Sequence, residues 1–502
     1  MSFKSILSKL FARHVARREA RISLDGIERQ KATLRKLLTM AKDTVFGKEH
    51  GFHSQMSHQD FIKAVPVRDY QALKPWIDRV VVGEPDVLWP GMPLYFCKTS
   101  GTTSGAKHIP LTKESMHNHI GSARNALLQY IAETGNASFL DGKMIFLQGS
   151  PTLTNTPGGV PSGRLSGIVA HHIPRYLQKN RLPSFQANCI ESWKEKIDAI
   201  VHETKDQDLR LISGIPSWVQ NYFERLLEVT GAENVLEVFP RFELFVYGGV
   251  AFEPYRAKFK ELIGAEVPSI ELFPASEGFF AYQDRQHEPG LRLNVDDGIF
   301  YEFIPVATYS DEHPVRLGLD GVELDVQYAM VLSSNAGLWG YDIGDSIKFV
   351  SLNPFRIVVT GRIKHFTSAF GEHVIAEEVE GAIGDAMKEM GGVITEFHVA
   401  PQVSPSDGLP FHEWFIEFQE LPADLEAFAS VINQSVMERN LYYRELIAGS
   451  ILRSAVMHPL PAGAFHQAME RLGRLGGQNK PPRLANHREF AEVLCQIEME
   501  VR

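Results

Sequence analysis

The sequence predicts an α/β protein with two domains. The large N-terminal domain, 1–362, is expected to combine α/β subdomains with a β-barrel-like subdomain, and 363–502 is expected to form a small α+β domain. Strand-like and helix-like segments alternate between 143 and 275, as in βα units around a mainly parallel sheet. Between 291 and 350 the apolar pattern changes to period two, which indicates antiparallel strands. The 502 residues also exceed what one hydrophobic core usually supports.

The N-terminal segment 4–21 is basic and somewhat amphipathic. A transit peptide or a membrane-surface helix has this composition. We favour an ordinary N-terminal helix, because the segment continues into the helical pattern of 22–48 without a small-residue cleavage site. No apolar run approaches the roughly 20 residues of a membrane span, so no membrane partner is expected.

The segment 61–89 carries three prolines and is expected to form short helices and turns that lead to a polar loop. That loop, 99–107, holds five hydroxyl residues and two glycines and closes on Lys107. Glycine lets backbone N–H groups turn toward an anion, hydroxyls add donors and lysine adds charge. The composition therefore predicts a phosphate-holding loop, with a polar surface turn as the alternative. A P-loop is excluded, because Gly101 and Gly105 do not have its Gly-x4-Gly-Lys-Ser/Thr spacing.

A helix over about 113–133 should follow the loop, with its N-terminus aimed at bound anions. The stretch 149–167 lacks a hydrophobic period and is expected to be an irregular loop, part of a substrate pocket or a lid. Two strands end in glycine or polar residues at 248–249 and 274–278, and ligands of open α/β sheets bind beyond such ends, so we expect a cleft there. The other expected elements are a strand at 143–148, a helix at 191–203, a strand at 209–213, helices at 217–229 and 376–387, strands at 395–400 and 412–418, and a helix at 425–439.

The net charge and the spacing of the cysteines indicate what kind of molecule the protein binds. A formal net charge of −10 argues against a nucleic-acid partner, which would need a clustered basic excess. Cys97, Cys189 and Cys495 are far apart and odd in number, so they make neither a disulfide framework nor a zinc site, which fits a reducing compartment. We therefore expect a cytoplasmic monomer that acts on small molecules.

Several segments resemble one family of enzymes. Residues 99–107 resemble the nucleotide loop of adenylate-forming enzymes, which join a carboxylate to AMP with loss of pyrophosphate. The segment 65–79 resembles one branch of them, the auxin-responsive acyl acid amido synthetases of the Gretchen Hagen family, and we expect a bacterial-type member. Residues 273–277 resemble the superfamily's Tyr-Gly-x-Thr-Glu signature, 341–345 its Tyr-x-x-Gly-Asp signature, and 478–483 the synthetases' Gln-Tyr-Lys-x-Pro-Arg.

The resemblance implies a role for each matched residue. Lys480, Glu277 and Lys107 would be catalytic; Glu277 would also hold Mg²⁺, and Lys480 would neutralise charge that develops on the α-phosphate. Asp345 would accept hydrogen bonds from the ribose hydroxyls, and Phe273 would stack on the adenine. The plainer interpretations are a solvated loop lysine for Lys480 and a hairpin turn at Asp345. The other residues expected to bind the nucleotide are Thr99, Ser100, Gly101, Thr102, Thr103, Ser104, Gly248, Gly249, Ser276 and Arg362.

By this resemblance the chain is a ligase that uses ATP and Mg²⁺ to adenylate a carboxylic acid and then transfers the acyl group to an amino acid or another amine. The small C-terminal domain would be mobile and rotate between the two steps. An acyl-CoA ligase with the same first step and a non-catalytic nucleotide-binding protein are the alternatives. We look for the acyl pocket among Gln148, Ser150, Ser213, Ile215, Trp218 and Phe279.

Overall fold

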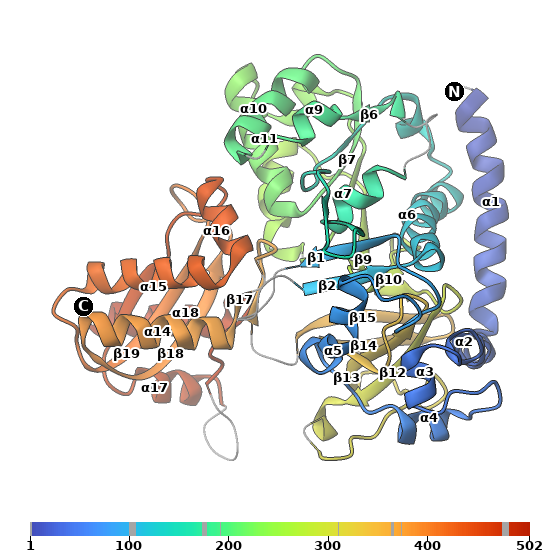
Figure 1. Cartoon of the computed structure of the whole chain (residues 1–502). Helices are drawn as coiled ribbons and strands as arrows, with labels where there is room; N and C mark the ends of the chain where they lie inside the picture. Colours follow the sequence, from blue (N-terminus) through green and yellow to red (C-terminus); the bar gives the residue numbers. More distant parts are fainter. Residues whose placement is uncertain are drawn as a thin grey trace.

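The computed structural model describes residues 3–99, 107–172, 178–190, 192–250, 252–309, 311–362, 366–372, 374–473 and 481–501. It is a mixed α/β protein with a large N-terminal domain and a separate C-terminal domain beside it (Figure 1). The predicted boundary between residues 362 and 363 adjoins 363–365, which lie outside the described ranges, and it stays a prediction.

The N-terminal region is helical, as the periodicity predicts. The predicted continuous helix over 22–48 is wrong, because the range is broken twice: one helix ends at Leu24, a second covers Gly26–Ala41, and a third begins at Val45. At the second break, the side chain of Thr44 accepts a hydrogen bond from the backbone N–H of Gly47. Gly47 must be glycine there, since a Cβ would lie 2.0 Å from the carbonyl oxygen of Ala41. The short helices predicted in the proline-containing segment are also present. The five helices are α1 (Phe3–Leu24), α2 (Gly26–Ala41), α3 (Val45–Glu49), α4 (His58–Ala64) and α5 (Tyr70–Val81).

One sheet of eleven strands forms the centre of the large domain, in the order β12-β13-β14-β15-β11-β10-β9-β8-β7-β3-β6. Its parallel half contains β3 (Lys143–Phe146), β6 (Arg181–Leu182), β7 (Leu209–Ser213), β8 (Leu244–Gly248) and β9 (Ser269–Ala275). Its antiparallel half contains β10 (Gly278–Tyr282), β11 (Leu291–Leu293), β12 (Ile299–Pro305), β13 (Gln327–Ser334), β14 (Tyr341–Leu352) and β15 (Phe355–Arg362).

The antiparallel strands predicted from the period-two pattern are present, but among the described residues they do not close into the expected barrel-like subdomain. The reason lies in the pairings of two short strands, β10 and β11. β10 pairs with the last parallel strand, β9, and β11 pairs with both β10 and β15, so the two halves continue as one sheet.

Helices cover both faces of the parallel half (Figure 1). α1 and α6 (Lys113–Thr134) pack on one face, against buried side chains such as Leu211 and Ile270. Side chains of the opposite face, such as Ile212 and Phe245, pack against three other helices. Alternate residues of a strand point to opposite faces, which is why the continuous apolar runs of these strands are buried on both sides. The three helices are α10 (Trp193–Thr204), α11 (Pro216–Thr230) and α13 (Arg256–Ile263).

A small second sheet carries the polar loop. β1 (Tyr95–Thr99) and β2 (Lys107–Leu111) pair antiparallel, and the sheet continues through β5 (Pro161–Gly163) to β4 (Thr154–Asn155). The stretch 149–167 is therefore not irregular throughout, contrary to our expectation, because β5 pairs with β1.

The expected anion site at the N-terminus of the helix over 113–133 is also wrong. β2 separates α6 from the polar loop, and the N-cap residue Thr112 is buried, with its hydroxyl accepting from the N–H of Ser115 and donating to the carbonyl of Asn335. The end of the helix dipole is thus satisfied inside the protein and does not line the cleft described below.

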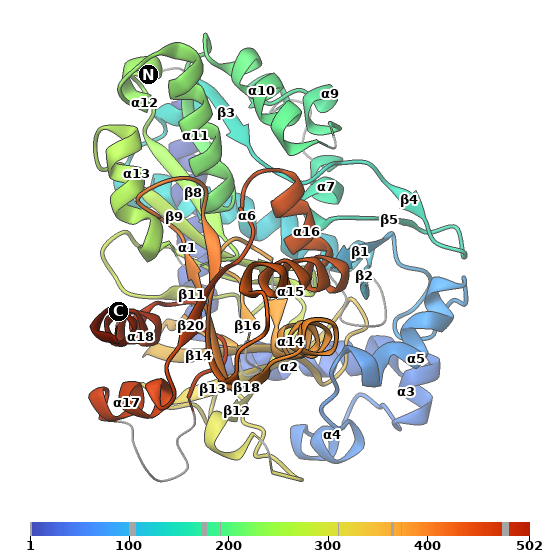
Figure 2. The ribbon, with the colours of Figure 1, turned by 90° about the vertical axis from the view of Figure 1, so that its left-hand side faces the viewer.

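The C-terminal domain has its own sheet, β18 (Val393–Gln402), β19 (Phe411–Glu420) and β20 (Val456–Leu460). Trp414 and Ile416 face one side of β19 and Phe415 faces the other, so each side has its own core. α14 (Ala376–Met390) and α15 (Leu425–Arg439) pack on the first side; α17 (Ala464–Arg471) and α18 (Glu489–Val501) pack on the second (Figures 1 and 2).

His458 on β20 predicts a pH dependence of this domain's stability. Its Nδ1 lies 2.9 Å from Glu498 and its Nε2 lies 3.4 Å from Glu413. Burial lowers the pKa of His458, but the two carboxylates outweigh burial and raise the pKa above its ordinary value. A raised folded-state pKa stabilises the protein below about pH 6.5, and this contribution is lost as the pH rises through the folded value.

We therefore expect thermal unfolding of the C-terminal domain to occur at a lower temperature at about pH 8.5 than at about pH 6. The variant His458→Gln should lose that difference, since it cannot titrate. An equal pH dependence in wild type and variant would show that another group is responsible.

Candidate active site

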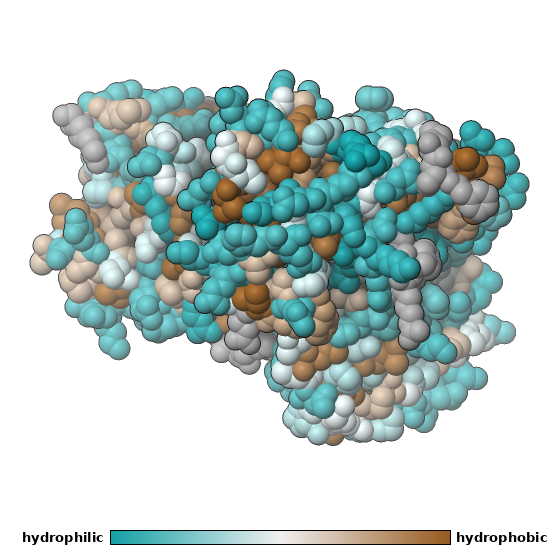
Figure 3. All heavy atoms as spheres, turned by 90° about the horizontal axis from the view of Figure 1, so that it is seen from above, coloured by the Kyte–Doolittle hydropathy of each residue, from teal (hydrophilic) through white to brown (hydrophobic). Residues whose placement is uncertain are grey.

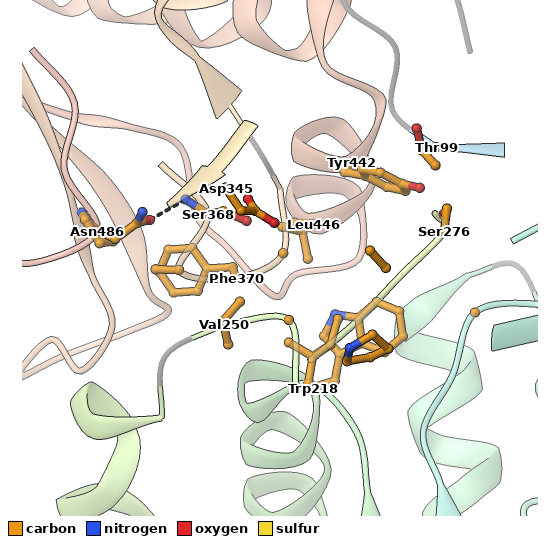
Figure 4. A pocket seen from close by; sticks show the side chains of 18 of the residues that line it. Thr99, Trp218, Val250, Ser276, Asp345, Ser368, Phe370, Tyr442, Leu446 and Asn486 are labelled. Carbon is orange, nitrogen blue, oxygen red and sulfur yellow. Dashed lines mark hydrogen bonds between the residues drawn. The ribbon is translucent and has the colours of Figure 1, made fainter. Parts of the chain in front are cut away.

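A cleft of about 2030 Å³ lies between the two domains, at the carboxyl ends of β7, β8 and β9. Residues of both domains line it, and Figure 4 draws 18 of them. Those labelled include Thr99, Ser276 and Asp345 of the large domain and Tyr442 of α16 (Leu441–Ala448). The cleft lies where the sequence predicted it, beyond the strand ends at 248–249 and 274–278.

The polar loop and the 273–277 segment come together at this cleft. Thr99 and Lys107, the two residues that flank the loop, are paired across β1 and β2, and both line the cleft. Cys97 on β1 lies beside the end of β9: burial, and then the charge of Glu277, raise the pKa of its thiol, and Ser276 hydrogen-bonds to it. Figure 4 accordingly shows Thr99 and Ser276 on the same side of the cavity.

Glu277 lies in the turn between β9 and β10 and lines the cleft. The hydroxyl of Tyr341, the first residue of β14, donates to its Oε1 over 3.4 Å. Burial and the charge of Glu277 raise the pKa of Tyr341 well above its ordinary value, so this phenol stays protonated and acts as a donor. The contact brings the 341–345 segment to the 273–277 segment, although they are far apart in the sequence.

Asp345 sits on a bulge inside β14 and not at a hairpin turn. The pairing of β13 with β14 shifts between Ala329 and Val331, and Gly344, just before Asp345, has a φ of 80°. Bulges of this kind redirect a side chain, and Asp345 lines the cleft. Its backbone neighbour across the ladder is Arg362, the last residue of β15. Asp345 and Arg362 are thus backbone neighbours on adjacent strands of the large domain.

The other matched residues occupy different positions. Gly249 has a φ of 84° and lines the cleft, whereas Gly248 does not line it: a Cβ on Gly248 would lie 2.5 Å from the carbonyl oxygen of Leu272, so close packing of β8 on β9 requires glycine there. Phe273 lines the cleft but is 9% exposed, with its ring packed edge-on against Phe280 at 5.1 Å. Ser100, Gly101, Thr102, Thr103, Ser104 and Lys480 lie outside the described residues.

Four of the six residues expected in the acyl pocket line the cleft: Gln148, Ser150, Ile215 and Trp218. Ser213 and Phe279 do not. Ser213 ends β7, and Phe279 is 3% exposed on β10, where it packs in the core under α6, so the expectation was wrong for these two.

The structure adds cationic residues that sequence reasoning missed. Lys196 of α10 lines the cleft although it is 4% exposed, and its ammonium donates to the carbonyls of Gln148 and Asn188 at 3.0 and 2.8 Å. Burial, and then the nearby charge of Arg164, lower the pKa of Lys196 to about 8. A lysine four residues before the buried Ile200 lies on the apolar face of its helix, and this was the signal in the sequence.

Arg164 also connects the domains. Its guanidinium forms an ion pair with Glu445 of α16 and lies 5.0 Å from the ring centre of Tyr442. Tyr255 of the large domain donates to the carbonyl of Ala369 over 2.6 Å. Figures 1 and 2 show α16 on the side of the C-terminal domain that faces the large domain. The C-terminal domain therefore forms one wall of the cleft.

The residues of the cleft fit a magnesium nucleotide. Glu277 and Asp345 are carboxylates, Thr99 and Ser276 are hydroxyls, and Lys107 supplies a positive charge. Mg²⁺ takes one or two carboxylates together with phosphate oxygens, and hydroxyls and a lysine suit the phosphates themselves.

Three family models match the chain. They are the GH3 family N-terminal domain over 20–188, the GH3 family central domain over 293–362 and the GH3 family C-terminal domain over 377–489. Indole-3-acetic acid-amido synthetase GH3.3 of Arabidopsis thaliana is 20% identical over 93% of this chain and 90% of its own. Jasmonoyl--L-amino acid synthetase JAR4 of Nicotiana attenuata is 21% identical over 65% of this chain and 67% of its own.

The fold is similar to that of other proteins whose structures have been solved. The acyl acid amido synthetase AtGH3.15 in complex with 2,4-DB is similar with a TM-score of 0.58 at 16% identity, over 94% of both chains. A 2-hydroxyisobutyryl-CoA ligase with 2-HIB-AMP and CoA is similar with a TM-score of 0.56 at 14% identity, over 95% of this chain and 92% of its own. Within the described ranges, none of the helices combines the length and the apolar character that crossing a membrane requires.

Proposed function

Because the chain belongs to the GH3 family, we propose that it is an ATP-dependent acyl acid amido synthetase. It joins a carboxylic acid to an amino acid or another amine through an acyl-adenylate. The observation that carries this proposal is the convergence of Thr99, Lys107, Glu277 and Asp345, from segments far apart in the sequence, on one cleft between two domains. The named relatives include amido synthetases for two different acids, which supports an amine as the acceptor.

The reaction consists of two displacements. A carboxylate oxygen of the acid attacks the α-phosphorus of ATP, the new C–O–P linkage forms, and the bond from the α-phosphorus to the pyrophosphate oxygen breaks. The amine nitrogen then attacks the acyl carbon, a C–N bond forms, AMP leaves with the electron pair of the broken C–O bond, and the nitrogen loses a proton. In both steps the protein positions the reactants and stabilises negative charge.

We assign the following roles to the residues. Lys107 and the hydroxyls of Thr99 and Ser276 bind phosphate, Asp345 accepts from the ribose, and Glu277 would hold Mg²⁺, which neutralises phosphate charge when bound. Ser100, Gly101, Thr102, Thr103, Ser104, Gly249, Phe273 and Arg362 complete the proposed nucleotide site. Lys480 is the proposed second cation for the α-phosphate. Gln148, Ile215 and Trp218 line the proposed acyl side, next to Lys196 and Arg164.

The experiment that tests the function measures pyrophosphate release from MgATP across a panel of carboxylic acids, each with no acceptor, with mixed amino acids and with CoA. We expect release to require an acid and to rise with amino acids, and mass spectrometry should then detect the amide. Release that rises with CoA alone would identify an acyl-CoA ligase. An absence of acid-dependent release over the panel, with ATP bound, would leave a nucleotide-binding protein.

A further inference from the structure

The outer face of α1 carries an exposed apolar patch. Ile6, Leu7, Leu10 and Phe11 are each between 49 and 59% exposed. Successive residues of a helix are 100° apart, so these four lie together on its first two turns. The other large apolar side chains that are exposed among the described residues occur singly along the sequence. The view onto the upper face (Figure 3) is mainly hydrophilic, with apolar atoms scattered over it.

The inner face of the same helix is fixed to the large domain. Ser5 donates to Asp141 over 2.8 Å, and Ala12 and Val15 are buried in the core with α6. Glu19 accepts from Asn125 and from the buried guanidinium of Arg292, both at 3.1 Å. These anchors span about four turns, so the helix cannot rotate to hide its apolar patch. The exposure of the patch is a property of the folded domain.

Basic side chains follow the patch along the same face. α1 contains six lysine and arginine residues and one carboxylate, Glu19, which is buried, in a chain whose formal net charge is −10. Arg13, Arg17 and Arg21 are four residues apart and exposed, so they form a row that continues from Ile6 and Leu10. Within the described part of the chain no carboxylate forms an ion pair with these three arginines.

We infer that this face of α1 binds an anionic lipid surface, and the exposed patch thereby reverses our expectation from the sequence that the protein has no membrane partner. A helix with an apolar patch and a basic, acid-free outer face lies in the membrane interface, with apolar side chains in the acyl boundary and arginines at the phosphates. A second copy of the chain fits this face less well. Two parallel copies of α1 would place arginine against arginine, and two antiparallel copies would place arginine against the apolar patch. α1 is also the outermost helix of its side of the molecule, so a flat surface can reach it (Figure 1).

The test uses the full-length protein and two kinds of vesicle, phosphatidylcholine alone and phosphatidylcholine with phosphatidylglycerol. We expect flotation with the anionic vesicles to exceed that with the neutral ones by about tenfold, and to fall with added salt. Leu10→Ser/Phe11→Ser and Arg17→Glu/Arg21→Glu should each reduce binding by about tenfold. Lys36→Glu/Lys42→Glu, which reverses two charges at exposed positions near and on α2, is the matched control and should bind like wild type.

All of the changed side chains are exposed, so thermal unfolding checks that each variant is folded. Failure of the wild-type protein to bind anionic vesicles, or equal binding by wild type and by both α1 variants, would overturn the inference. A wild-type dimer in sedimentation experiments that Leu10→Ser/Phe11→Ser dissociates, without vesicle binding, would assign the patch to a second copy and would also overturn it. These outcomes do not depend on the ligase activity, which is measured separately.

Discussion

Glu277→Gln is expected to reduce acid-dependent pyrophosphate release by about 10²- to 10³-fold in kcat/KM. Glu277 lines the cleft beside Ser276 and accepts from Tyr341, and it is the carboxylate that we assign to Mg²⁺. Glutamine keeps the size of the side chain but removes the charge that a hard cation needs. The magnesium concentration that gives half-maximal release should rise in the variant, which a merely structural change would not cause.

Glu271→Gln is the matched control for this experiment. Glu271 lies on β9, the strand that precedes Glu277, lines the same cleft and accepts from the hydroxyl of Tyr247 over 3.5 Å. Burial raises the pKa of Glu271, and we assign this carboxyl no contact with the metal or the phosphates. We expect release within a few-fold of wild type and an unchanged magnesium dependence. If the two variants lost activity equally, the metal role of Glu277 would be wrong.

Arg316→Met is expected to lower the free energy of unfolding of the large domain by about 3–5 kcal/mol. The guanidinium of Arg316 pairs with Glu302 of β12, whose side chain is fully buried and also accepts from His58 at 2.8 Å. Burial by itself would raise the pKa of Glu302, but His58 and Arg316 outweigh it and the pKa is lowered. Without Arg316, a charged carboxylate would remain buried with His58 as its remaining charge partner in the described structure.

Urea denaturation followed by circular dichroism measures this change. The control is Arg316→Met/Glu302→Leu, which removes both charges and should recover part of the lost stability, because no uncompensated charge remains. A double variant that is less stable than Arg316→Met would mean that Glu302 stabilises the domain without its arginine. Arg316 also donates to the carbonyl of Val65, which lies just before Arg68, and the backbone of Arg68 pairs with that of Tyr341. We expect the variant to lose activity only in proportion to the fraction of the protein that is unfolded.

The sequence by itself determined the elements and the family. The strand at 209–213 and the helix at 425–439 have the predicted bounds, because short apolar runs and helical periodicity are local properties of the chain. The family resemblance rested on motifs such as 273–277 and 341–345, and the family models that match the chain confirm the family.

Only the tertiary structure decided which of these residues face the cleft and which face the core. Phe279 and Gly248 lie in or beside matched segments, yet neither faces the cleft. Phe279 packs in the core under α6, and Gly248 lies in close contact with β9. Lys196 reaches the cleft from the apolar face of a helix, and the anchors of α1 turn its apolar patch outward. Burial and exposure depend on contacts between segments far apart in the chain, and a local pattern does not contain those contacts.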